Sequence, residues 1–234
     1  MASPSVARRT TRSTVESDDV VMMRAAELAE WARKNARAIM IATAVVLAAV
    51  GAALYYQLYK SGRAERAATA YLQVQSGLPA DTTQAIRQLQ TFTTQYPGTT
   101  EADEARIEIA QLYLQKGDAA RALEAIRPAA DGGTPVAEPA RFVQAAALAA
   151  SGKRDEAINE YLDLARDADL EFMKHNALNQ AAMLREQANN WNGAAELYRQ
   201  MLDGLEKGTG ERQLVELHLA EAQARAATAA APRR

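Results

Sequence analysis

The sequence predicts an all-α protein, and three observations support that prediction. Apolar residues make up 48% of the 234 residues, whereas aromatic residues make up only 6%. Alanine dominates the apolar fraction, which disfavours strands and favours closely packed helices. Breakers such as Gly, Pro and Asn recur between residues 76 and 208 and separate segments of helical length. A long uncharged run precedes these segments and has the length of a membrane helix.

The N-terminal region predicts two elements. Residues 1–16 are rich in Ser, Thr and Arg and hold almost no large apolar side chain, so we expect a disordered cytoplasmic tail. Residues 17–37 predict a juxtamembrane amphipathic helix, because Ser17 can cap it and apolar residues recur behind it at helical spacing. We interpret this helix as an extension of the anchor, with adhesion to the membrane surface as the alternative.

The uncharged run from Ala38 to Tyr56 predicts a transmembrane helix over residues 38–59. At 1.5 Å per residue the run spans about 28 Å, close to a hydrocarbon core. A buried core helix and a cleaved signal peptide are the alternatives, but the run contains little polarity and a long segment precedes it. Residues typical of membrane interfaces flank the run. These anchor-end residues are Trp31, Arg37, Tyr55, Tyr56 and Tyr59.

The flanking basic residues predict the orientation of the anchor. Within 20 residues of the span, four basic residues precede it and three follow it. Including Arg8, Arg9 and Arg12 makes the comparison seven against three. Because cytoplasmic flanks carry the excess of Lys and Arg, we expect a cytoplasmic N-terminus and a C-terminal domain across the membrane.

A repeat occupies residues 64–225. Small alanines that each begin a helical pattern stand at Ala85, Ala122, Ala157 and Ala194, with separations of 37, 35 and 37 residues. This period is close to that of tetratricopeptide units, in which small residues let two antiparallel helices cross closely. The sequence thus predicts a tetratricopeptide-like solenoid of about four helical hairpins. Residues 226–234 are of low complexity, and we expect a disordered tail there.

The repeat units differ in clarity. Residues 104–126 and 141–164 fit the order of small, aromatic or large, turn and small residues. The first unit is weaker because Gln73 occupies its small position, and in the fourth unit Asn189 replaces the turn glycine. Helix starts are also marked, since Asp81 with Gln84 can form a capping box and Thr100 with Asp103 a looser one.

The sequence offers no pattern for catalysis, a cofactor or a metal. It contains no cysteine, phosphate-binding loop, nucleophile elbow or metal-ligand spacing, and a net charge of −2 without a basic stripe argues against nucleic acid. We interpret His175 and His218 as separate surface or packing residues and the carboxylate clusters as helix caps or solvated faces. We therefore predict no enzymatic activity, no cofactor and no small-molecule substrate.

The expected function is protein binding on the face that the first helices of the hairpins share. Positions two, five and nine of these helices should line the groove. They are Glu104, Ile107, Gln111, Pro139, Phe142, Ala146, Asn176, Asn179 and Met183. The lining has too few cations for acidic tails and favours apolar or helical segments. Alternatively, these side chains cover neighbouring helices and bind nothing.

The anchor and the repeats together resemble a known family. The stretches ELAEWARKNARAIMIATAVVLAAVGAALYY, ERAATAYLQVQ, QYPGTTEADEARIEIAQLYLQKGDAARAL and ERQLVELHLAEAQA are similar in order and spacing to the YfgM-type ancillary subunits of the bacterial SecYEG translocon, over residues 27–225. That resemblance implies an inner-membrane anchor, a periplasmic repeat domain, and partners among translocon subunits, a periplasmic chaperone and emerging chains. A structural or assembly subunit of another inner-membrane complex is the alternative function.

Overall fold

The computed structural model describes residues 23–24 and 27–230, and these form helices and turns without a strand. The chain divides into two compact units, Met1–Lys60 and Ser61–Arg234. The predicted tail over residues 1–16 and the start of the helix predicted over 17–37 lie outside the described residues, as do the last four residues.

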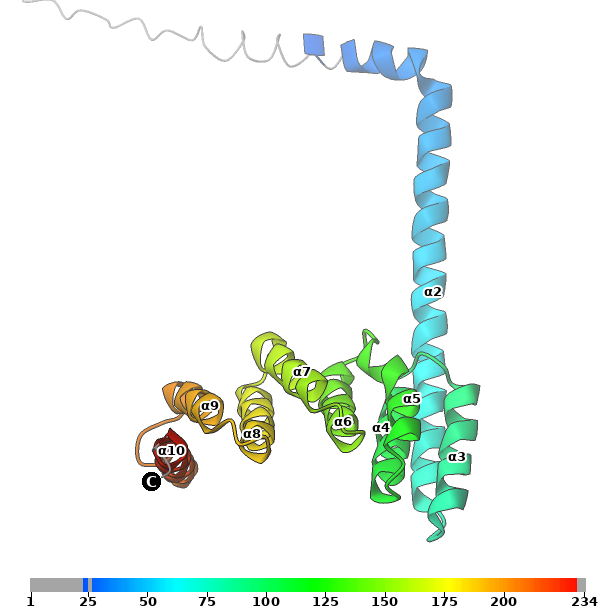
Figure 1. The fold of residues 1–234 in the computed structure, drawn as a ribbon. Helices are drawn as coiled ribbons and strands as arrows, with labels where there is room; N and C mark the ends of the chain where they lie inside the picture. The colour runs from blue at the N-terminus through cyan, green and yellow to red at the C-terminus, as the bar shows by residue number, and fades with distance from the viewer. Residues whose placement is uncertain (1–22, 25–26, 231–234) are drawn as a thin grey trace, which may run out of the picture. The chain divides into compact units, whose positions relative to one another are not determined.

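The helices follow one another in a simple order (Figure 1). Connections of three to six residues join the consecutive helices between Ala36 and Ala230. Their bounds are α2 Ala36–Ser76, α3 Thr82–Gln95, α4 Thr100–Gln115, α5 Ala119–Ala130, α6 Ala137–Ala150, α7 Arg154–Asp167, α8 Glu171–Gln187, α9 Trp191–Gly204 and α10 Gly210–Ala230. The hairpins α2/α3, α4/α5, α6/α7 and α8/α9 match the expected number of repeats, and α10 packs against α9.

The first unit contains the apolar part of α2. Residues 27–34 are helical, and a turn at Asn35 precedes α2, with the Asn35 N–H donating to the Trp31 carbonyl oxygen at 3.0 Å. Among the described residues, α2 is the one helix long and apolar enough to cross a membrane. Its large apolar side chains are exposed, including Ile41 at 66% and Leu47 at 65%.

Two predicted boundaries differ from the structure. Residues 61–63 separate the predicted transmembrane helix from the predicted repeat domain, which implies a short linker, but they lie inside α2. Helix α10 runs to Ala230, so residues 226–230 are helical rather than a disordered tail. The prediction gave more weight to an isolated Gly and to low complexity than to the neighbouring helix-forming residues. The helix continues because a single Gly costs it only about 1 kcal/mol.

Side-chain caps fix the starts of several repeat helices. Asp81 accepts a hydrogen bond from the Gln84 N–H at 2.8 Å, as the capping-box prediction requires. At α4 the cap is Thr99, whose hydroxyl oxygen accepts from the Ala102 N–H, so the prediction of Thr100 was one residue late. Asp118 and Asn190 cap α5 and α9 in the same way. These caps satisfy N–H groups that have no partner within the helix.

The turn inside each later hairpin requires left-handed backbone. Gly117 has φ 75° and Gly152 has φ 83°. Asn189 has φ 58° at the corresponding place, which confirms that it replaces the turn glycine of the fourth unit. Glycine adopts this conformation without steric cost, and Asn is the side chain that tolerates it best.

Buried alanines hold the paired helices together. The small positions of the first helices, Ala110 and Ala145, are 0% exposed, as are Ala122 and Ala157 of the second helices. Large side chains such as Ile126 and Tyr161 fill the grooves beside them. Burial of this apolar surface supplies the main stabilisation of the stack.

The first hairpin departs from the predicted register. Gln73, expected at the small position, is exposed, and Ala67 and Ala70 pack toward α3 instead. The turn over residues 77–81 is longer than the turn over residues 116–118, so the residues of α2 that meet α3 shift along the helix. The hairpin gains an aromatic cluster, since the Phe92 ring lies 5.3 Å from Tyr71 and 5.1 Å from Tyr96.

Candidate protein-binding surface

The first helices of successive hairpins lie side by side. Helix α4 contacts α6, and α6 contacts α8. Gln75 near the end of α2 donates a hydrogen bond to Glu108 of α4, which brings the first hairpin to the same surface. We call the surface formed by the repeat part of α2 with α4, α6, α8 and α10 the inner face. Stacked helix pairs present such a face for binding.

The predicted groove residues occupy this face with different exposures. Glu104, Ala146 and Asn179 are half-buried, whereas Gln111 and Asn176 are exposed. Met183 is 41% exposed and its sulfur lies 3.9 Å from the Asn179 amide nitrogen. These residues are therefore available in part to a bound segment.

Two predicted groove residues also serve the core. Ile107 packs against the cluster that contains Ala110 and Ala122. The Phe142 ring lies 5.2 Å from the Tyr161 ring in an edge-on arrangement, and Pro139 beside it is half-buried. An edge-on aromatic pair of this kind stabilises the interface between α6 and α7. Ile107 and Phe142 therefore cover a neighbouring helix in addition to lining the predicted groove.

The N-terminal part of the inner face is acidic. Burial and then the charge of Glu101 raise the pKa of Glu104. Burial raises the pKa of Tyr71 on α2, and the charges of Glu108 and Glu104 raise it further. The Oε2 atom of Glu101 is buried and accepts no hydrogen bond from a described residue. Glu101, Glu104 and Glu108 thus place negative charge here, and none of the three forms an ion pair within the described residues.

The C-terminal part of the inner face contains a small cavity that the sequence did not predict. Its volume is about 120 Å³, and it lies between α8, α9 and α10. His175 and His218 line it together, although they stand apart in the sequence. His175 Nδ1 lies 3.7 Å from a carboxylate oxygen of Glu211, and the His218 ring stacks on Tyr198.

The predicted groove residues Asn176 and Asn179 line the same cavity, and its apolar wall comes from Met201, Leu214 and Val215. A cavity of this size accommodates a single side chain. The packing of α10 against its neighbours creates this cavity. The spacing of residues within one helix cannot predict a cavity between helices.

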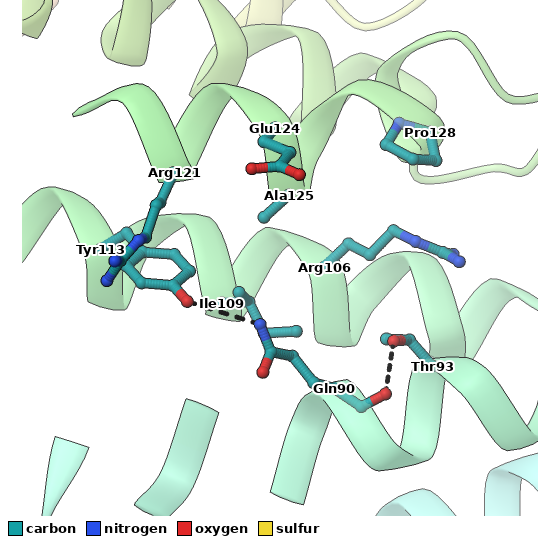
Figure 2. A pocket seen from close by; sticks show the side chains of 9 residues that line it. All are labelled: Gln90, Thr93, Arg106, Ile109, Tyr113, Arg121, Glu124, Ala125 and Pro128. Carbon is teal, nitrogen blue, oxygen red and sulfur yellow. Dashed lines mark hydrogen bonds between the residues drawn. The ribbon is translucent and has the colours of Figure 1, made fainter. Parts of the chain in front are cut away.

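A second hollow lies where the second helices α3 and α5 meet α4 (Figure 2). It has a volume of about 340 Å³ and is formed by α3, α4 and α5. The Arg121 guanidinium lies 5.9 Å from the centre of the Tyr113 ring, and Gln90 donates to the Tyr113 hydroxyl. Arg106 lines the other side and pairs with Asp103 at 2.6 Å. Both arginines have carboxylate partners, since Arg121 lies 3.4 Å from Asp118.

The anchor-end residues of the sequence prediction are exposed. Trp31 is 59% exposed, Tyr55 73%, Tyr56 66% and Tyr59 58%. Arg37 at the start of α2 is exposed as well. Exposed aromatic rings near both ends of an apolar helix are typical of membrane interfaces. No group of three or more His, Cys, Asp or Glu residues within the described ranges has a metal-binding arrangement.

Comparison with known structures relates the fold to repeat proteins. A tetratricopeptide repeat protein from Parabacteroides merdae ATCC 43184 is 17% identical with a TM-score of 0.53, over 70% of this chain and 61% of that one. A putative kinesin light chain with TPR-like repeats from Podosopora anserina is 14% identical with a TM-score of 0.52, over 72% of this chain and 87% of the other. At these identities the likeness concerns the fold alone.

Comparison of the sequence with known protein families identifies the family of this chain. No curated protein is significantly similar to the chain. The family described as tetratricopeptide repeat-like domain matches residues 29–224, which include the apolar part of α2 and all four hairpins. The chain therefore belongs to the tetratricopeptide repeat-like domain family.

Proposed function

We propose that the protein is a membrane-anchored adaptor that binds protein partners through its repeats at the periplasmic side of the inner membrane. Repeats of this family generally mediate protein–protein interactions and are typically non-enzymatic scaffolds. The observation that carries the proposal is the joining of an exposed apolar helix to a repeat domain in one chain.

Exposure of the apolar segment supports the anchor. The core helix of a soluble protein buries its apolar side chains, but Val46 is 60% exposed and Leu54 is 56% exposed. A contiguous apolar surface of this extent is unfavourable in water and favourable in a bilayer. The interfacial Trp and Tyr residues and the excess of basic residues before the span fit an N-terminus in the cytoplasm.

The similarity to YfgM-type subunits suggests where the adaptor acts. An accessory subunit of the protein translocon, linked to a periplasmic chaperone, would hold emerging chains or chaperones next to the exit site. The translocon subunits, the chaperone and the emerging chains are therefore the proposed partners.

Photocrosslinking in native membranes tests this function. A photoreactive amino acid at Met183 or Gln111 samples the inner face, and the same group at exposed Arg127 on α5 serves as the control. We expect crosslinks to translocon subunits, a chaperone or emerging chains from the two inner-face positions and fewer from Arg127. Recovery of none of these proteins from Met183 and Gln111 would contradict the proposal.

A structural or assembly subunit of a different membrane complex is the second candidate function. Small residues at Ala44, Ala48, Gly51 and Ala52 permit close lateral packing of α2. A Cβ added to Gly51 would meet no atom of this chain within 4 Å, so no contact of this chain requires a glycine there. Purification in mild detergent separates the two functions, because a structural subunit stays bound at a fixed ratio and an adaptor does not.

A further inference from the structure

Carboxylates on the N-terminal part of the inner face lack cationic partners. Glu104 and Glu108 lie one turn apart on α4, and neither forms an ion pair with a residue that the structure describes. Glu108 accepts a hydrogen bond of 2.6 Å from the neutral Gln75 amide. The negative charge of this part of the inner face is therefore available to a bound cation.

The arginines of α4 and α6 pair with other carboxylates. Arg106 of α4 pairs with Asp103 and lines the opposite hollow. Arg141 of α6 binds Glu160 and Asp167 of α7, at 2.9 and 3.3 Å. Neither guanidinium group therefore pairs with Glu104 or Glu108.

Lys174 and Arg185 complete the cations of α8. Lys174 pairs with Glu171 at 2.8 Å, one turn before it. Arg185 points toward α9. Its Nη1 atom lies so close to Gly193 that a Cβ added to this glycine would be only 2.6 Å away. On α4, α6 and α8, the cations thus pair with carboxylates of their own hairpin or turn toward the second helix, and Glu104 and Glu108 keep no ion pair.

Apolar side chains continue the inner face toward its C-terminal part. Met183 is 41% exposed and Leu214 is 54% exposed, and Leu214 forms a wall of the cavity of about 120 Å³. Glu211 lies at the rim of this cavity with 60% of its side chain exposed. The inner face therefore combines an acidic N-terminal part with a C-terminal part in which apolar side chains lie beside Glu211.

We propose that the inner face binds a cationic amphipathic polypeptide segment, in which Lys or Arg residues are interspersed with large aliphatic ones. The cations reach Glu104 and Glu108, and an aliphatic side chain enters the cavity beside Leu214. The inference rests on the proposed function, because it specifies the chemistry of the partner bound by the same surface. Charge complementarity supports this choice, since a partner of the opposite sign removes the mutual repulsion of the carboxylates.

A synthetic helical peptide of Lys and Leu provides the probe, and a control peptide of the same length carries Glu in place of each Lys. The full chain is held in nanodiscs of zwitterionic lipid, and binding is measured by fluorescence anisotropy, with empty nanodiscs subtracted. We expect the Lys peptide to bind with an affinity that falls as salt is added and the Glu peptide not to bind. Equal binding of both peptides, or no binding of the Lys peptide, would overturn the inference.

Paired substitutions locate the binding site. Combining Glu104→Gln with Glu108→Gln should weaken binding of the Lys peptide about tenfold, the effect of losing two partly exposed ion pairs. The matched control combines Glu196→Gln with Asp203→Asn on α9, which removes the same charge from exposed positions on a second helix and should leave the affinity unchanged. Equal weakening in both variants would show attraction to net charge alone and contradict the inference.

The two proposals can fail separately. If the Glu104→Gln, Glu108→Gln variant still crosslinks the same membrane proteins from Met183 at the same yield, the partner chemistry is wrong and the adaptor function stands. If no translocon subunit, chaperone or emerging chain is crosslinked but the Lys peptide binds with the expected charge dependence, the adaptor function fails and the inner-face chemistry stands.

Discussion

At the scale of single residues, buried alanines set the distance between paired helices. Ala122 and Ala157 are 0% exposed, each at the crossing predicted from the repeat spacing. Their positions could be predicted because a small residue every repeat is a pattern in the sequence itself. That His175 and His218 line the same cavity could not be predicted, because it depends on how α10 packs beside α8.

Enlarging Ala122 tests the repeat register. Ala122→Leu should lower the free energy of unfolding by about 1 to 3 kcal/mol, because a crossing without free volume must open to admit the larger side chain. Urea denaturation of the full chain in detergent measures the change. Ala120→Leu is the control, since Ala120 is exposed on the same helix and should change stability by less than about 0.5 kcal/mol. Equal stability of the two variants would contradict the register.

The raised pKa of Glu104 predicts a pH-dependent stability effect. Burial disfavours the ionised form, so Glu104 opposes folding above its pKa, and the penalty disappears as the pH falls below that value. Glu104→Gln should therefore raise the melting temperature at neutral pH, with a difference that vanishes near about pH 4. Thermal melts at the two pH values check this, with Glu196→Gln expected to change neither. A lower melting temperature for Glu104→Gln at neutral pH would contradict the assignment.

At the scale of elements, turns and caps define the hairpins. Gly117 and Gly152 adopt positive φ where the helices of a hairpin join, and Asn189 does so in the fourth hairpin. The sequence predicts these turns because few residues tolerate that conformation. Element ends were harder to predict, as the continuation of α2 through residues 61–63 and of α10 to Ala230 shows. Neighbouring helix formers outweigh one weak position at such ends.

The fourth turn offers a test at this scale. Asn189→Val should destabilise the chain by about 1 to 2 kcal/mol, because a β-branched side chain clashes with the backbone at positive φ. Asn189→Gly should be tolerated without loss, since glycine occupies the same position in the second and third hairpins. Chemical denaturation distinguishes the two variants. A loss of equal size in both would show that the Asn189 side chain, rather than its backbone conformation, stabilises the turn.

At the scale of the whole molecule, the sequence predicted a long apolar helix followed by helical hairpins, and the structure contains both in that order. A long uncharged run and a repeat of regular period each involve many residues. They can therefore be recognised even where single residues depart from the pattern. The groove on the inner face stays a prediction, and the structure adds that Ile107 and Phe142 also pack against the core. The acidity of its N-terminal part depends on which carboxylates Arg106 and Arg141 pair with, and the sequence does not show that pairing.

Single-cysteine labelling tests the central claim, an anchored repeat domain on the far side of the membrane, most directly. The chain has no cysteine, so Ser3→Cys and Gln213→Cys each introduce one unique thiol. After alkaline washing of the membranes, both variants should remain in the membrane fraction. A membrane-impermeant maleimide should label Gln213→Cys in cells with a permeabilised outer membrane and Ser3→Cys only after lysis. Release of the chain by the wash, or the reverse labelling, would contradict the account.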